Sequence, residues 1–325
     1  MLNTTRAKVI EGRGVMGETK IPYADKACNA VVGCTHSGMP GCDNCWSKDL
    51  HDKRHKAFLG GRDVAKQYAK PFSEVQLLPE RIEEPLHWRK PRTSFWCSTS
   101  DIFHKDVPDE FIWQMIRRMD FTSWHTHLIL TKRIERAAKL LTPDNLLIET
   151  GRPELHQSIL TGCSCSTQDD LNKMLPHLLQ IPGRHWLSLE PLLEEIDVSY
   201  GGVGITCPEC KGKGYITNRK HWMHPSNTGD DAGQNWCMDC NNLTSGINPI
   251  VAGIDWVVVG CESGSKGRPC DIEWVRSVVR QCERPEVPVY VKQVEINGKV
   301  STKIREWPEW ARVQQLPWEK NENQV

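Results

Sequence analysis

Four cysteines near the start of the chain have a spacing that could hold a metal centre. Cys28, Cys34, Cys42 and Cys45 fall within eighteen residues, in the pattern C-x5-C-x7-C-x2-C. Glycine and proline at positions 38–41 force an irregular loop, and the x2 spacing lets the last two thiolates face one metal. Such a loop can wrap an iron–sulfur cluster, because its backbone N–H groups can point at the sulfurs, or it can hold one zinc ion. The spacing alone leaves both interpretations open.

A second group of cysteines lies in the segment 203–251. Two CxxC pairs, CPEC and CMDC, are separated by 26 residues, and KGKGY follows the first pair. Four such thiolates complete a tetrahedral shell, with bonds of about 2.3 Å, around one ion. This pattern predicts a structural zinc in a ribbon-like insertion, bound by Cys207, Cys210, Cys237 and Cys240. The insertion is either a stapled surface loop or a small basic and aromatic module that touches a polymer substrate.

Composition limits where the chain could act. Lys and Arg number 41 and Asp and Glu number 41, so the chain has no overall basic field and any nucleic-acid binding needs a local patch. The first residues, MLNTTRAKVI, lack the apolar core of a signal peptide, and no run of about 18 apolar residues occurs. We therefore expect a soluble cytoplasmic protein. Thiols stay reduced in that compartment, so fourteen cysteines favour metal ligation over disulfides.

The elements that must position these groups alternate along the chain. After a short apolar run at 31–33, strands are predicted within 93–100, 127–133, 158–167, 185–193, 255–264 and 287–293. Helices are predicted at 49–70, 108–119, 134–141, 168–181 and 271–282. Continuous apolar runs are typical of parallel strands buried on both faces, and right-handed crossovers can close such a repeat into a full or partial (β/α) barrel. A doubly wound open sheet is the alternative.

Polar residues end each predicted strand, which favours the barrel, because barrel active sites lie on that rim. The domain boundaries then follow. Residues 1–27 form an N-terminal segment, 28–202 the first part of the barrel with the cysteine loop, 203–251 the insertion, and 252–325 the last part of the barrel with a C-terminal segment.

Seven motifs in this order resemble a phage-associated protein family with a three-cysteine (C-x7-C-x2-C) cluster loop, similar to radical S-adenosylmethionine (SAM) enzymes. They are GCTHSGMPGCDNCW (33–46), STSDIFHKDVPDEF (98–111), HLILTKR (127–133), GCSCSTQDD (162–170), LSLEPLL (187–193), GCESGSKGRPCDIEWVR (260–276) and VYVKQ (289–293). The resemblance covers most of the chain outside the insertion. It implies a radical SAM-type partial or full (β/α) TIM barrel, and a host-cytoplasmic location if the chain is phage-encoded.

The resemblance also implies a cofactor set. Cys34, Cys42 and Cys45 would hold a [4Fe–4S] cluster with one open iron, to which SAM would bind, and the pair would generate a 5′-deoxyadenosyl radical. That radical would abstract a hydrogen atom and start a rearrangement, of isomerase or lyase type, or another radical modification of the substrate. The first substrate candidate is a modified nucleobase in phage DNA, and a flavodoxin or ferredoxin would donate the electron. Two features depart from the family: radical SAM enzymes more often use C-x3-C-x2-C, and Trp46 stands where this family usually has Tyr.

The strand-end residues are the candidates for binding and catalysis. We expect a cofactor-binding set of Ser98, Ser100, Asp101, Thr131, Lys132, Ser164, Ser166, Glu190 and Arg268. We expect the catalytic or substrate-facing set to be Lys292, Glu262 and Cys163, the last as a hydrogen-atom donor. For serine and aspartate the competing interpretation is helix capping or a turn. Charged groups at the ends of buried strands need a partner, so capping explains them less well.

A function of a different class also fits the cysteines. The chain could be a non-catalytic, zinc-dependent nucleic-acid-binding protein with two four-cysteine sites, one of them formed by Cys28, Cys34, Cys42 and Cys45. Cys28 distinguishes the two interpretations, because it is either a fourth ligand or a buried thiol. The polar strand ends count against the binder, since a zinc scaffold does not need them on one rim.

Overall fold

The computed structural model describes residues 19–199, 253–264, 266–283 and 285–318. It also describes two short strands, β8 (Tyr215–Thr217) and β9 (Gln234–Trp236), which pair antiparallel. The four cysteines predicted to bind zinc, Cys207, Cys210, Cys237 and Cys240, lie outside the described residues. The zinc site therefore stays a prediction.

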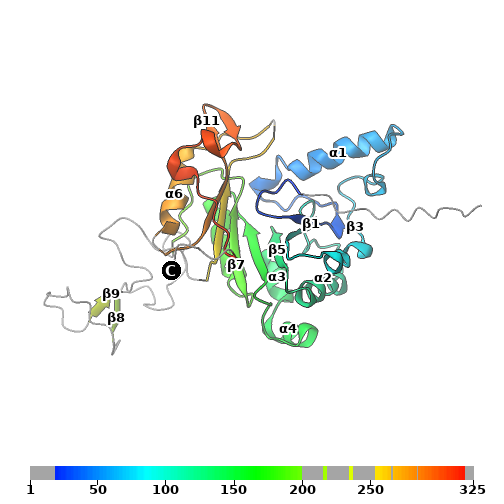
Figure 1. The fold of residues 1–325 in the computed structure, drawn as a ribbon, viewed down its shortest axis with the longest axis horizontal. Coiled ribbons are helices and arrows are strands. Elements are labelled where there is room, and N and C mark those ends of the chain that lie inside the picture. The colour runs from blue at the N-terminus through cyan, green and yellow to red at the C-terminus, as the bar shows by residue number, and fades with distance from the viewer. Residues whose placement is uncertain are drawn as a thin grey trace, which may run out of the picture.

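One large sheet organises the fold (Figure 1). Its strands are β1 (Lys26–Cys28), β4 (Thr93–Trp96), β5 (Thr126–Thr131), β6 (Ile159–Ser164), β7 (Arg184–Leu189), β10 (Trp256–Gly260), β11 (Val289–Ile296) and β12 (Lys299–Ser301). They lie side by side in sequence order, and all pairs are parallel except β11 with β12. The order never reverses, so the described sheet has no switch point of the doubly wound kind.

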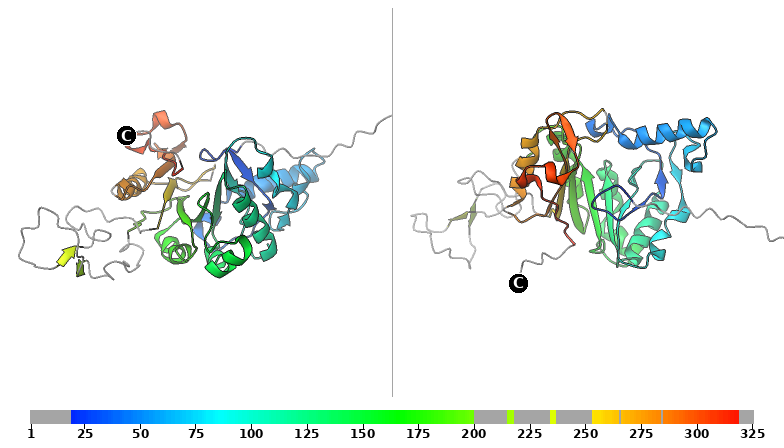
Figure 2. Two further views of the ribbon diagram at one scale, coloured as in Figure 1. Left: turned by 60° about the horizontal axis from the view of Figure 1, so that its bottom comes forward. Right: turned by 45° about the horizontal axis from the view of Figure 1, so that its top comes forward.

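Helices cover one face of this sheet (Figure 2). They are α2 (Asp109–Phe121), α3 (Ile134–Leu140), α4 (Pro143–Thr150), α5 (Gln168–Leu178) and α6 (Ile272–Glu283), while α1 (Trp46–Leu59) extends away from the body of the fold. Short 3-10 helices occur at Pro40–Cys42, Lys66–Tyr68, Pro79–Arg81, Glu84–His87, Ile304–Glu306 and Glu309–Ala311. The sheet and its helices enclose the larger apolar core, in which alternate strand residues such as Ile129 and Val257 are fully buried.

The contacts of Tyr23 show that the sheet curls towards the face that these helices leave uncovered. Its ring lies 6.4 Å from that of Phe95 on β4 and 5.3 Å from that of Tyr290 on β11. The Phe95 and Tyr290 rings are thus no more than about 12 Å apart. Five interstrand spacings separate β4 from β11, about 24 Å in a flat sheet. The sheet is therefore strongly concave towards Tyr23, but it stays open, because β1 and β12 are its two ends in the described part of the chain.

Close packing inside the concave face explains one glycine. A Cβ added to Gly162 on β6 would lie 2.5 Å from Nε1 of Trp186 on β7. The missing side chain leaves room for the indole, which donates a hydrogen bond to Ile129 O at 3.0 Å. The rings of Trp186 and Trp256 then pack 5.1 Å apart beside Tyr23 and fill the space inside the concave face.

Two boundaries differ from the sequence prediction. The apolar run before Cys34 forms β2 (Val31–Val32), which pairs with β3 (Gln76–Leu77) in a separate two-stranded sheet, so the first strand of the main sheet is the earlier β1. The helix predicted at 49–70 begins at Trp46 and ends at Leu59. Gly60 and Gly61 follow, and Gly61 has φ +74°, which a helix cannot accommodate.

Candidate functional site

The cysteine loop lies at the carboxyl edge of the sheet, where it joins α1. Cys42 closes the 3-10 turn Pro40–Cys42, and Cys45 is the N-cap residue of α1. The Ser37 hydroxyl lies 3.1 Å from Cys42 Sγ. All three loop thiols are partly buried, and burial raises the pKa of Cys34 to about 11 although the nearby Arg133 guanidinium opposes that shift. Without a metal, Cys34 would be a neutral thiol at pH 7.

Arg133, which follows β5, holds the start of the cysteine loop at Cys34 and Thr35. Arg133 donates to Thr35 O at 2.8 Å, and its Nη1 lies 3.7 Å from Cys34 Sγ. Asp101 fixes the guanidinium at 2.9 Å. The same carboxylate accepts from the Thr131 hydroxyl at 2.7 Å and from the Lys132 backbone N–H at 3.0 Å. Asp101 is thus committed to protein contacts and organises this corner.

A second group of contacts, around the Glu262–Arg268 ion pair, holds the other end of the cysteine loop. Glu262, after β10, is buried and pairs with Arg268 at 2.6 Å. Arg268 also donates to Pro40 O at 2.9 Å, and its Nη1 lies 3.3 Å from the Asp43 carboxylate. Asn44 donates to Glu262 at 3.1 Å. Both ends of the C-x7-C-x2-C loop are therefore tied to strand ends that lie far away in sequence.

Two lysines lie inside the rim, beneath the loop. Lys132 donates to the Ser164 hydroxyl at 2.7 Å, and Lys292 forms an ion pair with Glu190 at 2.9 Å. The Tyr23 hydroxyl is 3.5 Å from the other Glu190 oxygen. Burial, followed by the charge of Glu190, raises the pKa of Tyr23 well above its ordinary value, so the phenol stays protonated. Ammonium, carboxylate and hydroxyl groups thus converge in the concave face.

Ser166 connects this interior to the cysteine loop. Its hydroxyl is buried and has no hydrogen-bond partner within the described residues. A Cβ added to Gly41 would lie 2.5 Å from that hydroxyl and 3.2 Å from Lys132 Cε. The loop backbone therefore packs directly on the ends of β5 and β6, and glycine at position 41 permits the contact.

The remaining predicted residues lie elsewhere. Ser98 donates to the Asn29 side chain at 3.2 Å, and Ser100 donates to Gly33 O at 2.5 Å, so both support turns next to the loop. Cys163 is fully buried in the larger, helix-covered core, with its sulfur 3.7 Å from that of Cys165. Ser164, one position on, faces the opposite side. The structure thus brings Lys132, Ser164, Glu190 and Lys292 together and leaves Cys163 outside that group.

Cys28 lies apart from the loop thiols. It is fully buried in β1, and its carbonyl accepts from the Cys97 N–H at 2.8 Å. Burial raises the pKa of its thiol, and the charged or ionisable neighbours that add to the shift are Glu84 and Cys97. No three of the described His, Cys, Asp and Glu side chains converge closely enough for a single metal ion. The ligands of an iron–sulfur cluster lie farther apart than those of one ion, so this spacing does not conflict with a cluster.

Several residues of this site were not among the sequence candidates. Arg133 directly follows the strand-end pair Thr131-Lys132, and that position was its signal. Asn44 lies inside the cysteine motif, beside Cys45. Tyr23 precedes every strand, and no local pattern indicates that its ring enters the concave face. Its position depends on the curvature of the whole sheet.

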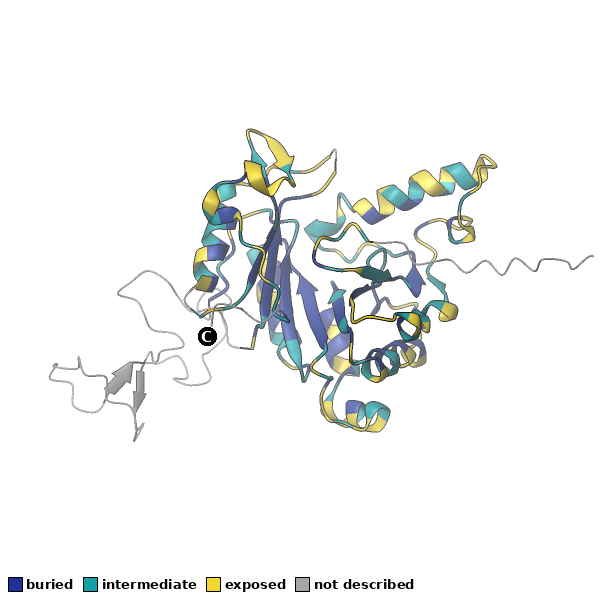
Figure 3. Ribbon diagram, viewed as in Figure 1, coloured by how far each residue is buried: buried dark blue, intermediate teal, exposed yellow. Residues whose placement is uncertain are grey.

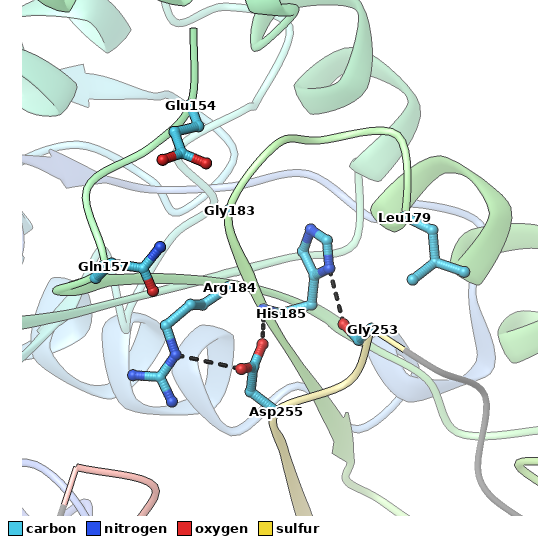
Figure 4. A pocket seen from close by; sticks show the side chains of 8 residues that line it. All are labelled: Glu154, Gln157, Leu179, Gly183, Arg184, His185, Gly253 and Asp255. Carbon is cyan, nitrogen blue, oxygen red and sulfur yellow. Dashed lines mark hydrogen bonds and ion pairs between the residues drawn. The ribbon is translucent and has the colours of Figure 1, made fainter. Parts of the chain in front are cut away.

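A separate shallow pocket lies at the opposite, amino edge of the sheet (Figure 4). Arg184 and Asp255 form an ion pair at 3.3 Å within it, and His185 Nδ1 lies 2.9 Å from Gly253 O. Arg184 and Asp255 satisfy one another, and none of the loop cysteines lines the pocket. We assign it no chemistry.

The contacts of Glu262 with Arg268 and Asn44 predict that the stability of the fold depends on pH. Burial would raise the pKa of Glu262, but hydrogen bonds from Arg268 and Asn44 outweigh burial and lower it. A depressed native pKa stabilises the fold above the unfolded value, near 4.3, and that contribution disappears as pH falls through the native pKa. We expect Glu262→Gln to cost about 2 kcal/mol at pH 7 and progressively less below about pH 4.3.

Thermal unfolding from pH 3 to pH 7 measures this difference. Glu309→Gln, at an exposed carboxylate, is the control and should track the wild type throughout. A constant gap between Glu262→Gln and the wild type across this range would contradict the assignment.

The fold and site define an α/β protein with a largely parallel, concave sheet and a cysteine loop at its carboxyl edge. Residues 18–314 match the model of a family described as a protein of unknown function, DUF5131, and the chain belongs to that family. No curated protein matches it. No helix in the described part is long and apolar enough to cross a membrane.

Among solved structures, the chain shows weak similarity to spore photoproduct lyase. The lyase complexed with dinucleoside spore photoproduct matches with a TM-score of 0.35 and 12% identity, over 57% of this chain and 50% of that one. A cysteine-to-alanine mutant of the lyase with the same dinucleoside matches with a TM-score of 0.35 and 14% identity, over 54% and 48%. The chain thus spans about half the length of these proteins. A likeness this slight carries no functional argument.

Proposed function

We propose that this protein is a radical SAM enzyme built on a partial (β/α) barrel. One observation carries the proposal: a loop with three thiols is held from both sides over a concave sheet whose strand ends present two lysines, a glutamate and two serines. Arg133 and Arg268 hold the loop. Lys132 and Lys292 are the ammonium groups beneath it.

The residues present fit the implied cofactors. Cys34, Cys42 and Cys45 would hold the [4Fe–4S] cluster, and Cys28 is buried elsewhere, which leaves three thiolates rather than four. When bound, the cluster would supply the electron that cleaves SAM to a 5′-deoxyadenosyl radical. Lys132 and Lys292 can bind a carboxylate, Glu190 an ammonium, and the free Ser166 hydroxyl a ribose or a sulfur. The buried aromatic rings around Tyr23 exclude water from the part of the concave face that they fill.

The substrate and partners are part of the same proposal. A nucleobase, already modified within DNA, is the substrate that we propose, with hydrogen abstraction followed by a rearrangement. A flavodoxin or ferredoxin would donate the electron. The predicted zinc insertion, with Cys207, Cys210, Cys237 and Cys240, would help to hold the polymer.

Anaerobic reconstitution tests the proposal. The protein should turn brown, bind about four irons and one zinc per chain, and release 5′-deoxyadenosine from SAM after reduction. Iron and zinc analysis with chromatography of the nucleoside measures all three. A colourless protein with two zincs and no SAM cleavage would instead support the non-catalytic binder.

Arg133 should raise the reduction potential of the proposed cluster. A hydrogen bond and a positive charge at a ligand sulfur stabilise the more negative, reduced cluster and so raise its reduction potential. We therefore expect Arg133→Met to lower the potential by tens of millivolts, measured by titration followed with electron paramagnetic resonance. Arg136→Met is the matched control, because Arg136 contacts Val107 O at 2.7 Å and not the loop. An unchanged potential in Arg133→Met would show that Arg133 only packs against the loop.

A further inference from the structure

The segment that follows the cysteine loop forms a separate arm with an uneven charge. Residues 46–70 comprise α1, a glycine turn and a return segment, and they carry seven Lys and Arg against three Asp. The whole chain is neutral, so this arm concentrates positive charge. In Figures 1 and 3 it projects from the body and is largely exposed, and only Ser47 and His51 of α1 are buried.

The arm is a built structure rather than a loose tail. His51 Nε2 lies 2.9 Å from Lys70 O, and His55 Nδ1 lies 2.7 Å from Tyr68 O. Arg54 hydrogen-bonds the Tyr68 hydroxyl, and its guanidinium lies 5.0 Å from the centre of the ring. These polar contacts lock the return segment onto α1 and use one of the arm's cations.

Four other cations of the arm form no ion pair within the described part of the chain. Lys53 and Lys56 on α1, Arg62 at the turn and Lys66 on the return segment are exposed, and none has a carboxylate partner among the described residues. Lys48 and Lys70, by contrast, have acidic partners four residues on. Unpaired cations gathered on one arm match a chain of phosphates, because each contact releases condensed counterions.

An exposed aromatic residue stands at the base of the arm. Trp46 directly follows Cys45, and 47% of its surface is exposed. Along α1, Lys53 and Lys56 lie about 10 Å and about 15 Å beyond it, at 1.5 Å per residue. A strand laid on the arm would therefore reach the cysteine loop beside an indole on which a base can stack.

We propose that α1 and its return segment form the docking arm for a nucleic-acid strand, with Lys53, Lys56, Arg62 and Lys66 on the phosphates and Trp46 on a base next to the cysteine loop. The inference rests on the proposed function, since it states which polymer carries the substrate and where that polymer enters. An acidic lipid surface could bind the same cations, and an indole also suits a membrane interface, so binding to vesicles is the alternative outcome of the test.

Fluorescence anisotropy with the full-length protein tests the arm. The probe is a labelled single strand of about 12 nucleotides, within the usual site size of strand-binding proteins. We expect Lys53→Glu with Lys56→Glu to weaken binding about tenfold or more, and to reduce the slope of log affinity against log salt by about 1.4, since each contact to a single strand contributes about 0.7. The control, Lys90→Glu with Lys139→Glu, makes the same change in net charge on exposed residues outside the arm and should bind like the wild type.

Trp46 distinguishes a strand from other polyanions. Trp46→Ala should weaken strand binding about tenfold, and Trp46→Phe should restore most of it, because either ring can stack. Circular dichroism confirms that each variant is folded. Equal weakening by the arm and control variants would overturn the proposal, as would preferential binding of phosphatidylserine vesicles over the strand.

The assay contains neither SAM nor reductant, so it separates the two proposals. A protein that releases 5′-deoxyadenosine but binds the strand equally well with and without its arm lysines would refute the arm alone. A protein that needs the arm lysines for binding but never cleaves SAM would refute the radical chemistry alone.

Discussion

Replacing Cys42 by alanine is expected to abolish the brown colour, the bound iron and the release of 5′-deoxyadenosine, with a loss of at least about a thousandfold in SAM cleavage, or about 4 kcal/mol. Cys34→Ala and Cys45→Ala should do the same, because a cluster bound by only two protein thiolates is readily lost. Absorbance, iron analysis and nucleoside chromatography on reconstituted protein measure the effect.

Cys28→Ala is the decisive comparison. Cys28 is buried in β1 beside Cys97 and away from the loop, so its loss should leave the iron content intact and cost about 1 kcal/mol of unfolding free energy. If Cys28→Ala loses its metal together with the other three variants, the four cysteines form one closed site and the radical mechanism is wrong.

The Glu190–Lys292 pair should have the second largest effect. Glu190→Gln and Lys292→Met each leave a partly buried charge without its partner, which we expect to cost about 2 kcal/mol, because Lys292 retains some contact with water. The double variant removes both charges and should be destabilised by clearly less than the sum. SAM cleavage should fall about a hundredfold in all three variants, since none restores the charges that face the ligand.

Chemical denaturation and SAM cleavage assays carry out this double-mutant cycle. Asp169→Asn with Lys173→Met, at an exposed ion pair, is the control and should show no measurable coupling, because solvent screens the pair. Recovery of SAM cleavage in the Glu190→Gln, Lys292→Met double variant would show that the pair only supports the fold.

The strands were predictable because each carries a continuous apolar run. Six of the predicted runs overlap β4, β5, β6, β7, β10 and β11, and the largely parallel sheet is confirmed. Full closure into a barrel is not: the described sheet ends at β1 and β12 without pairing them. The helix α4 was missed, although Thr142 caps it, Pro143 begins it and Gly151 ends it with φ +77°. These local signals were present in the sequence.

The candidate site was predictable in position but not in its contacts. Polar residues at strand ends must share one edge of a parallel sheet, and Lys132, Ser164, Glu190 and Lys292 do. The alternation of side chains along β6 could have shown that Cys163 faces away from Ser164. The links from Arg133 and Arg268 to the loop could not be foreseen, because they join segments about 100 and more than 200 residues apart.

Tyr23 has a consequence for how this molecule comes into being. Tyr23, which precedes the first strand, is enclosed by rings from β4 and from β11, and more than 260 residues separate Tyr23 from Tyr290. During synthesis the aromatic interior of the concave face stays incomplete until β11 has left the ribosome, because the residues that form it are so far apart in sequence. The nascent chain must therefore keep its exposed aromatic rings out of other contacts until the last parallel strand arrives.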